Sequence, residues 1–157
     1  MTAPFNIVLF QPEIPQNTGT IGRLAVSTNC RLHLIEPLGF SIEDKYLKRA
    51  GLDYWQHLSP SIHKDWASFL TAENPRRLFF ISTHGEKNFF DAEYNLGDYL
   101  VFGRESAGLP PEFYDSYRED MWKIPMPGKF SRSLNLANAV SIVLYEAMRQ
   151  NRKELEI

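Results

Sequence analysis

Three polar side chains at a loop-to-helix junction, Ser131, Ser133 and Asn135, are the first candidates for chemistry in this sequence. They follow a short apolar stretch and a break at Pro127 and Gly128, and they precede a strongly apolar segment. The first N–H groups of a helix have no partners within the helix, so such a junction favours polar or anionic ligands. The alternative is that one of these side chains only caps the helix.

Two further loops carry polar residues directly after expected strands. In the first, Gly19 and Gly22 allow close approach of backbone or ligand, between Asn17 and Arg23. The second loop, 103–109, reads GRESAGL and precedes a helix opened by proline. Strand–loop–helix turns commonly contain the catalytic or binding residues of α/β folds. The alternative for Arg23 is that it is solvated surface, as a single arginine on a helix usually is. Neither loop contains a dinucleotide fingerprint or a phosphate-binding loop motif.

The elements that must position these loops alternate between strand and helix patterns. The expected strands are 6–10, 31–36, 78–83, 99–102 and 121–124, with a short strand near 54–58 and an edge segment at 91–94. The expected helices are 18–28 with Asn17 as cap, one from the cap Ser41 to before Gly51, then 63–72, 111–117 and 134–152. This order predicts one α/β domain over residues 1–157, with a mostly parallel sheet flanked by helices and a frayed tail after about residue 152. A ligand site is expected at the carboxyl ends of the strands.

Composition excludes several classes of protein. The chain has 157 residues, 43% of them hydrophobic, and a net charge of −2, which excludes a generally basic nucleic-acid binder. One cysteine, Cys30, excludes an intrachain disulfide and fits a reducing compartment. No apolar run reaches the ~20 residues needed to cross a bilayer, and no signal-peptide pattern is present. We therefore expect a cytoplasmic protein without membrane contact.

The basic residues of one expected helix are grouped on one side. Lys45, Lys48 and Arg49 are spaced i, i+3, i+4. Such a cluster is either a solvated face or, beside a catalytic cleft, a site for phosphates. His57 and His63 have no metal-ligand partners at useful spacing in the sequence, so we expect structural or surface roles for both and no metal.

In this order and spacing, the three strand-end loops resemble the three motifs of the SPOUT superfamily of RNA methyltransferases, in its ribose 2′-O-methylating branch. The stretches LFQPEIPQNTG (9–19), LHLIEPLGF (32–40) and KRAGLDYW (48–55) sharpen the match. They are similar to the tRNA (cytidine/uridine-34)-2′-O-methyltransferase family, whose members are little more than a catalytic domain. The resemblance covers about residues 6–150. It implies a SPOUT fold whose C-terminal segment is threaded through a loop as a deep trefoil knot.

The resemblance also implies a cofactor, S-adenosylmethionine (product S-adenosylhomocysteine), and a set of site residues. The implied cofactor contacts are Ile81, Ser82, Thr83, Gly103, Gly108, Ile124, Met126, Ser133 and Leu134, several of them through the backbone. The implied catalytic or pocket-shaping residues are Arg23, Asn17, Glu105, Ser133, Asn135 and Tyr145. The chain departs from the family pattern at 128–130 and at Arg104, where proline is common. We expect these departures to affect RNA contacts rather than chemistry.

The implied reaction transfers a methyl group to the wobble ribose, position 34, of tRNA, with leucine tRNAs as expected substrates. Positioning should supply much of the acceleration, and the ribose hydroxyl must lose its proton. Arg23 is either the base or, because a guanidinium normally stays protonated, a group that binds phosphate and stabilises a developing alkoxide. The implied contacts to the anticodon stem-loop are Lys45, Lys48, Arg49, Lys129 and Arg132. A homodimer formed through the last helix would extend this limited basic area.

Two other functions remain open at this point. One is a SPOUT enzyme that methylates another RNA or another tRNA position. The other is a non-catalytic RNA- or nucleotide-binding module that has kept the fold. The joint presence of Arg23, Glu105, Ser133 and Asn135 argues against the second.

Overall fold

The computed structural model describes residues 2–157, apart from the side chains of residues 51 and 52. Its seven-stranded sheet has the order β3-β2-β1-β6-β4-β7-β5, and the pairings between these strands are parallel. The strands are β1 (Asn6–Phe10), β2 (Arg31–Ile35), β3 (Ser61–His63), β4 (Leu78–Ile81), β5 (Lys87–Asn88), β6 (Tyr99–Phe102) and β7 (Met121–Lys123). The helices are α1 (Pro15–Ser27), α2 (Lys45–Gly51), α3 (Trp66–Glu73), α4 (Pro111–Ser116), α5 (Leu136–Gln150), α6 (Arg152–Leu155) and the 3-10 helices η1 (Leu52–His57), η2 (Phe89–Asp91) and η3 (Arg118–Asp120).

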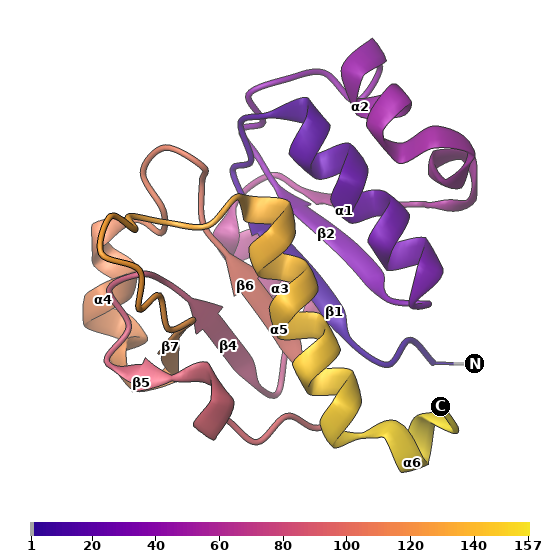
Figure 1. The fold of residues 1–157 in the computed structure, drawn as a ribbon. Helices are drawn as coiled ribbons and strands as arrows, with labels where there is room; N and C mark the ends of the chain where they lie inside the picture. Colours follow the sequence, from indigo (N-terminus) through magenta and orange to yellow (C-terminus); the bar gives the residue numbers. More distant parts are fainter. Residues whose placement is uncertain (1) are drawn as a thin grey trace.

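Helices cover both faces of the sheet. Helices α1 and α5 pack on one face, and α3 and α4 pack on the other (Figure 1). Alternate residues of each strand therefore enter two different cores, as Ile7 and Leu9 do on the α1 side and Val8 and Phe10 on the α3 side. Burial on both faces explains why these strands read as continuous apolar runs. The predicted α/β domain with a mostly parallel, helix-flanked sheet is confirmed.

The register of the central strands determines where the site lies. Ile81, the last residue of β4, pairs with Phe102 of β6 on one side and with Trp122 of β7 on the other. All three strands run in the same direction, so the loops that follow them leave from one edge of the sheet. The loops that the sequence singled out after these strands are thereby brought together.

Two predicted helix caps are wrong. Helix α1 begins at Pro15, so Asn17 lies inside the helix rather than at its cap. Proline fits this first position because its missing N–H would have no helical partner there. Helix α2 is capped by Asp44 and not by Ser41, since the Asp44 carboxylate accepts hydrogen bonds from the N–H groups of Tyr46 (2.7 Å) and Leu47 (3.4 Å).

The region between β2 and β4 also differs from the prediction. The expected strand at 54–58 is the 3-10 helix η1, and the strand lies further on, at β3. The helix expected from residue 63 begins at Trp66, because Asp65 accepts a hydrogen bond from the Ser68 N–H (2.8 Å) and so caps it. The edge segment expected at 91–94 is not a strand. The edge strand is β5, which is followed by the 3-10 helix η2, and residues 92–94 have no regular secondary structure. At the C-terminus, α6 occupies the stretch for which we expected fraying.

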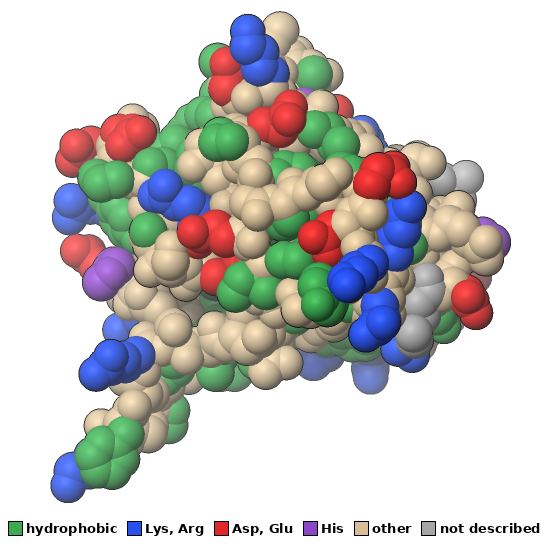
Figure 2. All heavy atoms as spheres, turned by 90° about the horizontal axis from the view of Figure 1, so that it is seen from above, with side chains coloured by type: hydrophobic (Ala, Val, Ile, Leu, Met, Phe, Trp, Pro, Cys, Tyr) green, Lys and Arg blue, Asp and Glu red, His purple; other side chains and the backbone are tan. Residues whose placement is uncertain are grey.

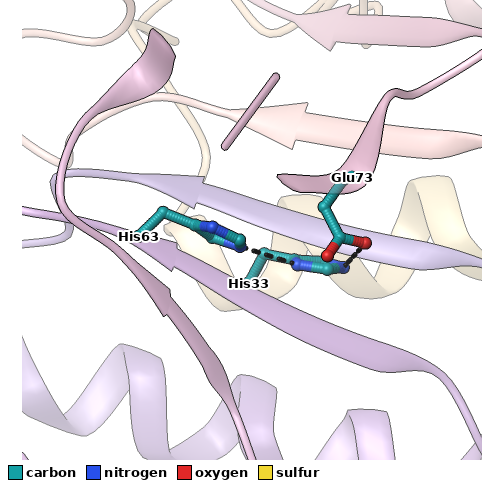
Figure 3. A group of neighbouring side chains, drawn as sticks. All are labelled: His33, His63 and Glu73. Carbon is teal, nitrogen blue, oxygen red and sulfur yellow. Dashed lines mark hydrogen bonds and ion pairs between the residues drawn. The ribbon is translucent and has the colours of Figure 1, made fainter. Parts of the chain in front are cut away.

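A buried polar cluster joins β2, β3 and the end of α3 (Figure 3). The Nδ1 atom of His33 lies 3.2 Å from Nε2 of His63, and its Nε2 atom lies 3.1 Å from Oδ1 of Asn6. A carboxylate oxygen of Glu73 is 3.8 Å from the same Nε2 and accepts hydrogen bonds from Tyr99 Oη (3.0 Å) and Arg31 (2.9 Å).

We expected no metal-ligand partners for His63 from the sequence spacing, but the folded chain provides them. Ligand atoms of His33, His63 and Glu73 lie within 4.8 Å of one another. These partners lie 30 and 10 residues away from His63 in the chain, where sequence spacing cannot reveal them. Both ring nitrogens of His33 already have polar partners, and Nε2 donates to the Asn6 Oδ1 atom, which can only accept. Burial lowers the pKa of His33, so the ring is neutral at pH 7. The structural role expected for His63 agrees with this network.

We expect this cluster to make the protein less stable in acid. Burial lowers the pKa of His33 to about 4, with Arg31 and His63 acting in the same direction and Glu73 opposing them. The unfolded chain therefore binds a proton at a higher pH than the folded chain, so stability is complete above about pH 6.5 and falls as the pH decreases toward 4. Urea denaturation should show a loss of about 2 kcal/mol between pH 7.5 and pH 5.

A matched pair of variants checks the source of this slope. His33→Asn keeps a donor and an acceptor but cannot titrate, so its unfolding free energy should depend less on pH. His57→Gln, at an exposed ring, should keep the wild-type slope. An unchanged slope in His33→Asn would assign the acid sensitivity to other groups.

Candidate active site

A cavity of about 430 Å³ opens at the carboxyl ends of β4, β6 and β7. The loops after these strands, the start of α5 and Asn17 of α1 form its wall. The wall includes every residue expected to contact the cofactor: Ile81, Ser82, Thr83, Gly103, Gly108, Ile124, Met126, Ser133 and Leu134. It also includes Asn17, Glu105 and Asn135 from the expected catalytic set. The second and third strand-end loops therefore form one site, and the first loop contributes Asn17 to it.

The glycine-punctuated loop after β6 is closed on itself. The Arg104 N–H donates to the Gly108 carbonyl (3.0 Å), and the Gly108 N–H donates to the Arg104 carbonyl (2.9 Å). Gly108 has a φ of +65°, in the left-handed region that favours glycine. A Cβ atom on Gly103 would lie 2.3 Å from the Gly108 carbonyl carbon. The turn therefore needs glycine at both positions, for two different reasons.

Two carboxylates bind this loop to the segment before α1. The Glu105 carboxylate accepts hydrogen bonds from the backbone N–H groups of Glu13 (3.0 Å) and Ile14. In return, the Glu13 carboxylate accepts from the N–H (2.9 Å) and the hydroxyl (2.7 Å) of Ser106. The backbone hydrogen bond from Ser106 is the main reason why the pKa of Glu13 is lowered. Glu105 is thus placed as an anchor of the cavity wall.

Asn135 has two roles at the start of α5. Its Oδ1 atom accepts a hydrogen bond from the Asn138 N–H (3.2 Å) and so caps the helix. Its Nδ2 atom donates to Oδ1 of the buried Asn17 (3.1 Å), which joins α5 to α1 across the cavity wall. Of the three polar residues at this junction, Asn135 is therefore the one that caps the helix, and it lines the cavity as well. Ser133 lines the cavity and is exposed.

Arg23 lies on α1 outside the cavity of its own chain. Its guanidinium carbon is 5.2 Å from the centroid of the Tyr54 ring, a cation–π contact. Asn17 and Arg23 leave the helix on different faces and about 9 Å apart along its axis, at 1.5 Å per residue. Gly22 permits the approach of η1 to α1, since a Cβ there would lie 2.6 Å from the Trp55 ring. The Arg23 side chain is exposed.

The other expected functional residues also lie outside the cavity. Tyr145 is 54% exposed on the outer face of α5, one turn after Ile142, which is 40% exposed. The basic residues expected to bind RNA are exposed on α2 and on the loop before α5: Lys45, Lys48, Arg49, Lys129 and Arg132. Lys48 forms an ion pair with Glu43 (2.7 Å), which offsets part of the positive charge on α2.

One cavity residue that the sequence analysis did not identify is Tyr114. It comes from α4, and its hydroxyl oxygen lies 2.6 Å from Oγ of Ser82, also in the wall. The Ser82 hydroxyl oxygen accepts a further hydrogen bond from the His84 N–H (3.1 Å). Tyr114 therefore fixes the side chain of an expected cofactor contact. Its position on the helix that follows the glycine-punctuated loop was the only available signal.

The chain is similar to known RNA methyltransferases. Residues 4–145 match the model of the SpoU rRNA Methylase family. A protein of Saccharophagus degradans named tRNA (cytidine(34)-2′-O)-methyltransferase is 52% identical over 147 residues, which cover 93% of this chain and 95% of that protein.

Two solved structures are informative. One, from work on the 2-OH methylation of C/U34 on tRNA, has a TM-score of 0.89 at 47% identity and covers 95% of this chain and 97% of that chain. The other is the SpoU methyltransferase AviRb from Streptomyces viridochromogenes in complex with the cofactor AdoMet. It has a TM-score of 0.82 at 26% identity and covers 98% of this chain and 63% of that chain.

The expected resemblance to SPOUT methyltransferases is thereby confirmed. Among the residues that the structure describes, no helix is long and apolar enough to cross a membrane. With its parallel sheet, its cavity at the strand ends and a relative of similar length at 52% identity, the chain belongs to the SpoU family of RNA methyltransferases.

Proposed function

We propose that this protein transfers a methyl group from S-adenosylmethionine to the 2′-hydroxyl of the wobble nucleotide, position 34, of tRNA. The nucleotide would be cytidine or a modified uridine, in leucine tRNAs. The observation that carries the proposal is that all residues expected to contact the cofactor surround one cavity. The names of the relatives support the substrate and the position of methylation.

The cavity suits S-adenosylmethionine in size and in wall chemistry. Its volume of about 430 Å³ lies in the range of small-molecule sites. At Gly103 the wall is backbone, because the close approach of Gly108 leaves no space for a Cβ atom. The wall contains apolar Ile81 and Ile124 as well as polar Ser133 and Asn135, which suits an amphipathic nucleoside. The cofactor would supply a methyl group on a positively charged sulfonium.

Arg23 is proposed to act on the ribose or on the phosphate beside it. A guanidinium offers a planar set of donors that matches phosphate oxygens and can stabilise a developing alkoxide. The alternative is that Arg23 takes the proton from the hydroxyl. Its exposure and its contact with Tyr54 favour a group that meets an incoming RNA rather than the cofactor.

The proposed active form is a homodimer. Ile142 and Tyr145 expose apolar surface one turn apart on α5, the helix expected at the interface. Because Arg23 lies outside the cavity of its own chain, one subunit would bind the anticodon stem-loop while the other supplies the cofactor. Sedimentation at assay concentration tests this arrangement, and an active monomer would contradict it. The enzyme would act in the cytoplasm, where its tRNA substrate is found.

We further propose that the single domain of residues 1–157 contains the trefoil knot. Strand β7 lies between β4 and β5, although it follows both in the chain. The connection from β4 to β5 crosses the end of β7, where the Ser82 N–H donates to the Trp122 carbonyl (2.9 Å). A Cβ on Gly85 would lie 2.7 Å from the Trp122 carbonyl carbon, so the two segments are in close contact. An experimental structure in which the segment 82–135 forms no loop around the C-terminal segment would contradict the proposed knot.

One experiment tests the proposed function. The protein is incubated with labelled S-adenosylmethionine and total tRNA that lacks 2′-O-methyl groups, and the labelled nucleotide is mapped. Label on the wobble ribose, with leucine tRNAs labelled most, is the expected result. Label at another position would favour a different RNA substrate, and cofactor binding without transfer would favour a binding module.

Glu105→Ala is expected to weaken S-adenosylmethionine binding by about tenfold, because hydrogen bonds to a charged acceptor are worth ~1.5–3 kcal/mol. The variant loses the bonds that hold the glycine-punctuated loop to Glu13 and Ile14. Isothermal titration calorimetry gives the affinity, and Glu112→Ala, at an exposed carboxylate on α4, is the matched control. Normal cofactor binding with a complete loss of methyl transfer would instead give Glu105 a role in the chemistry.

A further inference from the structure

Phe130 is the most exposed large apolar side chain in the part of the chain that the structure describes. It is 91% exposed, whereas Ile157 and Phe90, the next in order, are 70% and 59% exposed. In the view onto the carboxyl ends of the strands, an arm at the lower left ends in hydrophobic and basic side chains (Figure 2). Leaving an aromatic ring in water forgoes roughly 1.5–3 kcal/mol of burial, so its position calls for an explanation.

The turn that carries Phe130 is closed by hydrogen bonds. The Ser131 hydroxyl donates to the carbonyl of Gly128 (2.9 Å) or of Met126 (3.2 Å), and the Ser131 N–H also approaches the Gly128 carbonyl (3.3 Å). The Phe130 ring therefore projects from a hydrogen-bonded turn and not from an irregular loop. The turn includes residues 128–130, where the resemblance implied a departure from the family pattern.

The turn is attached to the rim of the cavity. Met126 before it and Ser133 after it both line the cavity wall. The Phe130 ring itself is not part of that wall. A ligand that contacts Phe130 must therefore lie outside the cofactor cavity but next to its mouth, which is where the RNA substrate has to approach.

The charges around Phe130 are positive. The Lys129 ammonium lies 5.8 Å from the centroid of the Phe130 ring, and Arg132 is exposed on the same turn. No acidic residue occurs in the segment 121–135. An aromatic ring between cations matches single-stranded nucleic acid, in which bases stack on rings and phosphates pair with the flanking charges. A ring intended for a protein partner would be expected within a broader apolar patch.

We propose that Phe130 is a stacking platform for an unpaired base of the anticodon loop beside the target nucleotide, with Lys129 and Arg132 on the adjoining phosphates. The proposal rests on the proposed function, because it assigns the RNA contact of the same site. Stacking holds the loop open at the mouth of the cavity, so that the wobble ribose can enter. Phe130 is thus a substrate-binding residue and takes no part in the chemical step.

Steady-state kinetics on an anticodon stem-loop test the proposal. Phe130→Ala and Phe130→Leu should raise KM about tenfold, since stacking contributes ~1–3 kcal/mol per base, with kcat little changed. Phe130→Tyr and Phe130→Trp should remain near wild type, because they keep an aromatic face. The control Phe90→Ala removes another exposed ring, from η2, and should not change KM.

Binding measurements separate the possible failures. A 2-aminopurine base placed beside position 34 should be quenched by the wild-type protein and not by Phe130→Ala. If Phe130→Leu matches wild type, the ring acts only as apolar surface and the proposal is wrong. A lower affinity of Phe130→Ala for S-adenosylmethionine, or its dissociation into monomers, would likewise reassign the ring to the cavity or to a subunit interface. If the wild-type protein methylates no RNA, the proposed function fails, while the quenching measurement still reports stacking.

Discussion

Replacing Arg23 with alanine should reduce kcat about a thousandfold while leaving S-adenosylmethionine binding within about twofold of wild type. A base or a charge-stabilising donor typically contributes a factor of ~10² to 10⁴. Arg23 is exposed and outside the cavity wall, so its removal should not disturb the cofactor contacts. Single-turnover methyl transfer and calorimetric cofactor binding measure the two quantities separately.

Two further variants show what the Arg23 effect means. Arg76→Ala removes another exposed arginine, at the opposite end of the sheet before β4, and should retain activity. Arg23→Lys keeps a positive charge but loses the planar pair of donors, so a large loss there indicates bidentate binding of phosphate or alkoxide. Near-normal turnover by Arg23→Ala would overturn the assignment altogether, whatever the behaviour of Arg23→Lys.

The position of the cavity at the strand ends could be predicted from sequence because its determinants are local. Each of its loops follows a short apolar strand, and parallel strands deliver such loops to the same edge of the sheet. The resemblance then indicated residues such as Ile81 and Ile124, whose side chains carry no chemical signal of their own. The pairing of Ile81 with Phe102 and Trp122 gives the physical reason why these loops meet.

Contacts between distant parts of the chain could not be predicted in this way. The hydrogen bond between Tyr114 and Ser82 joins residues 32 positions apart, and the His33–His63 contact spans 30. Neither distance is a sequence motif. The register of β2 and β3 and the packing of α4 create these contacts only once the sheet has formed.

Helix boundaries failed where two residues competed for the same role. Asn17 is a good cap by type, but Pro15 fits the first turn, and the helix starts there. Asp44 displaced Ser41 for a similar reason, because its carboxylate reaches two N–H groups of α2. In both cases the residue that starts or caps the helix lies within three residues of the one that we expected. Sequence patterns do not locate the end of a helix more exactly than this.

Gly103→Ala is expected to lower the affinity for S-adenosylmethionine by about ten- to a hundredfold and to lower the melting temperature. A Cβ atom at this position would lie 2.3 Å from the Gly108 carbonyl carbon and 2.4 Å from the Leu109 nitrogen. Both neighbours are backbone atoms of the closed loop, so no side-chain rotation can relieve the clash. The loop must open, and forced backbone shifts of this kind cost ~1–3 kcal/mol or more. Because the loop is cavity wall, the site deforms with it.

The other glycines supply a graded series of controls. Gly108→Ala meets no neighbour within 4 Å but has a φ of +65°, so it should show only the moderate cost of left-handed backbone, about 1 kcal/mol. Gly128→Ala has its nearest neighbour at 4.0 Å and should bind the cofactor as wild type does. Calorimetry with S-adenosylmethionine and thermal unfolding should therefore rank the losses as Gly103, then Gly108, then Gly128. If Gly103→Ala binds the cofactor normally, the closed loop is not what shapes the site, and the cavity must be held by the Asn17–Asn135 contact between α1 and α5 instead.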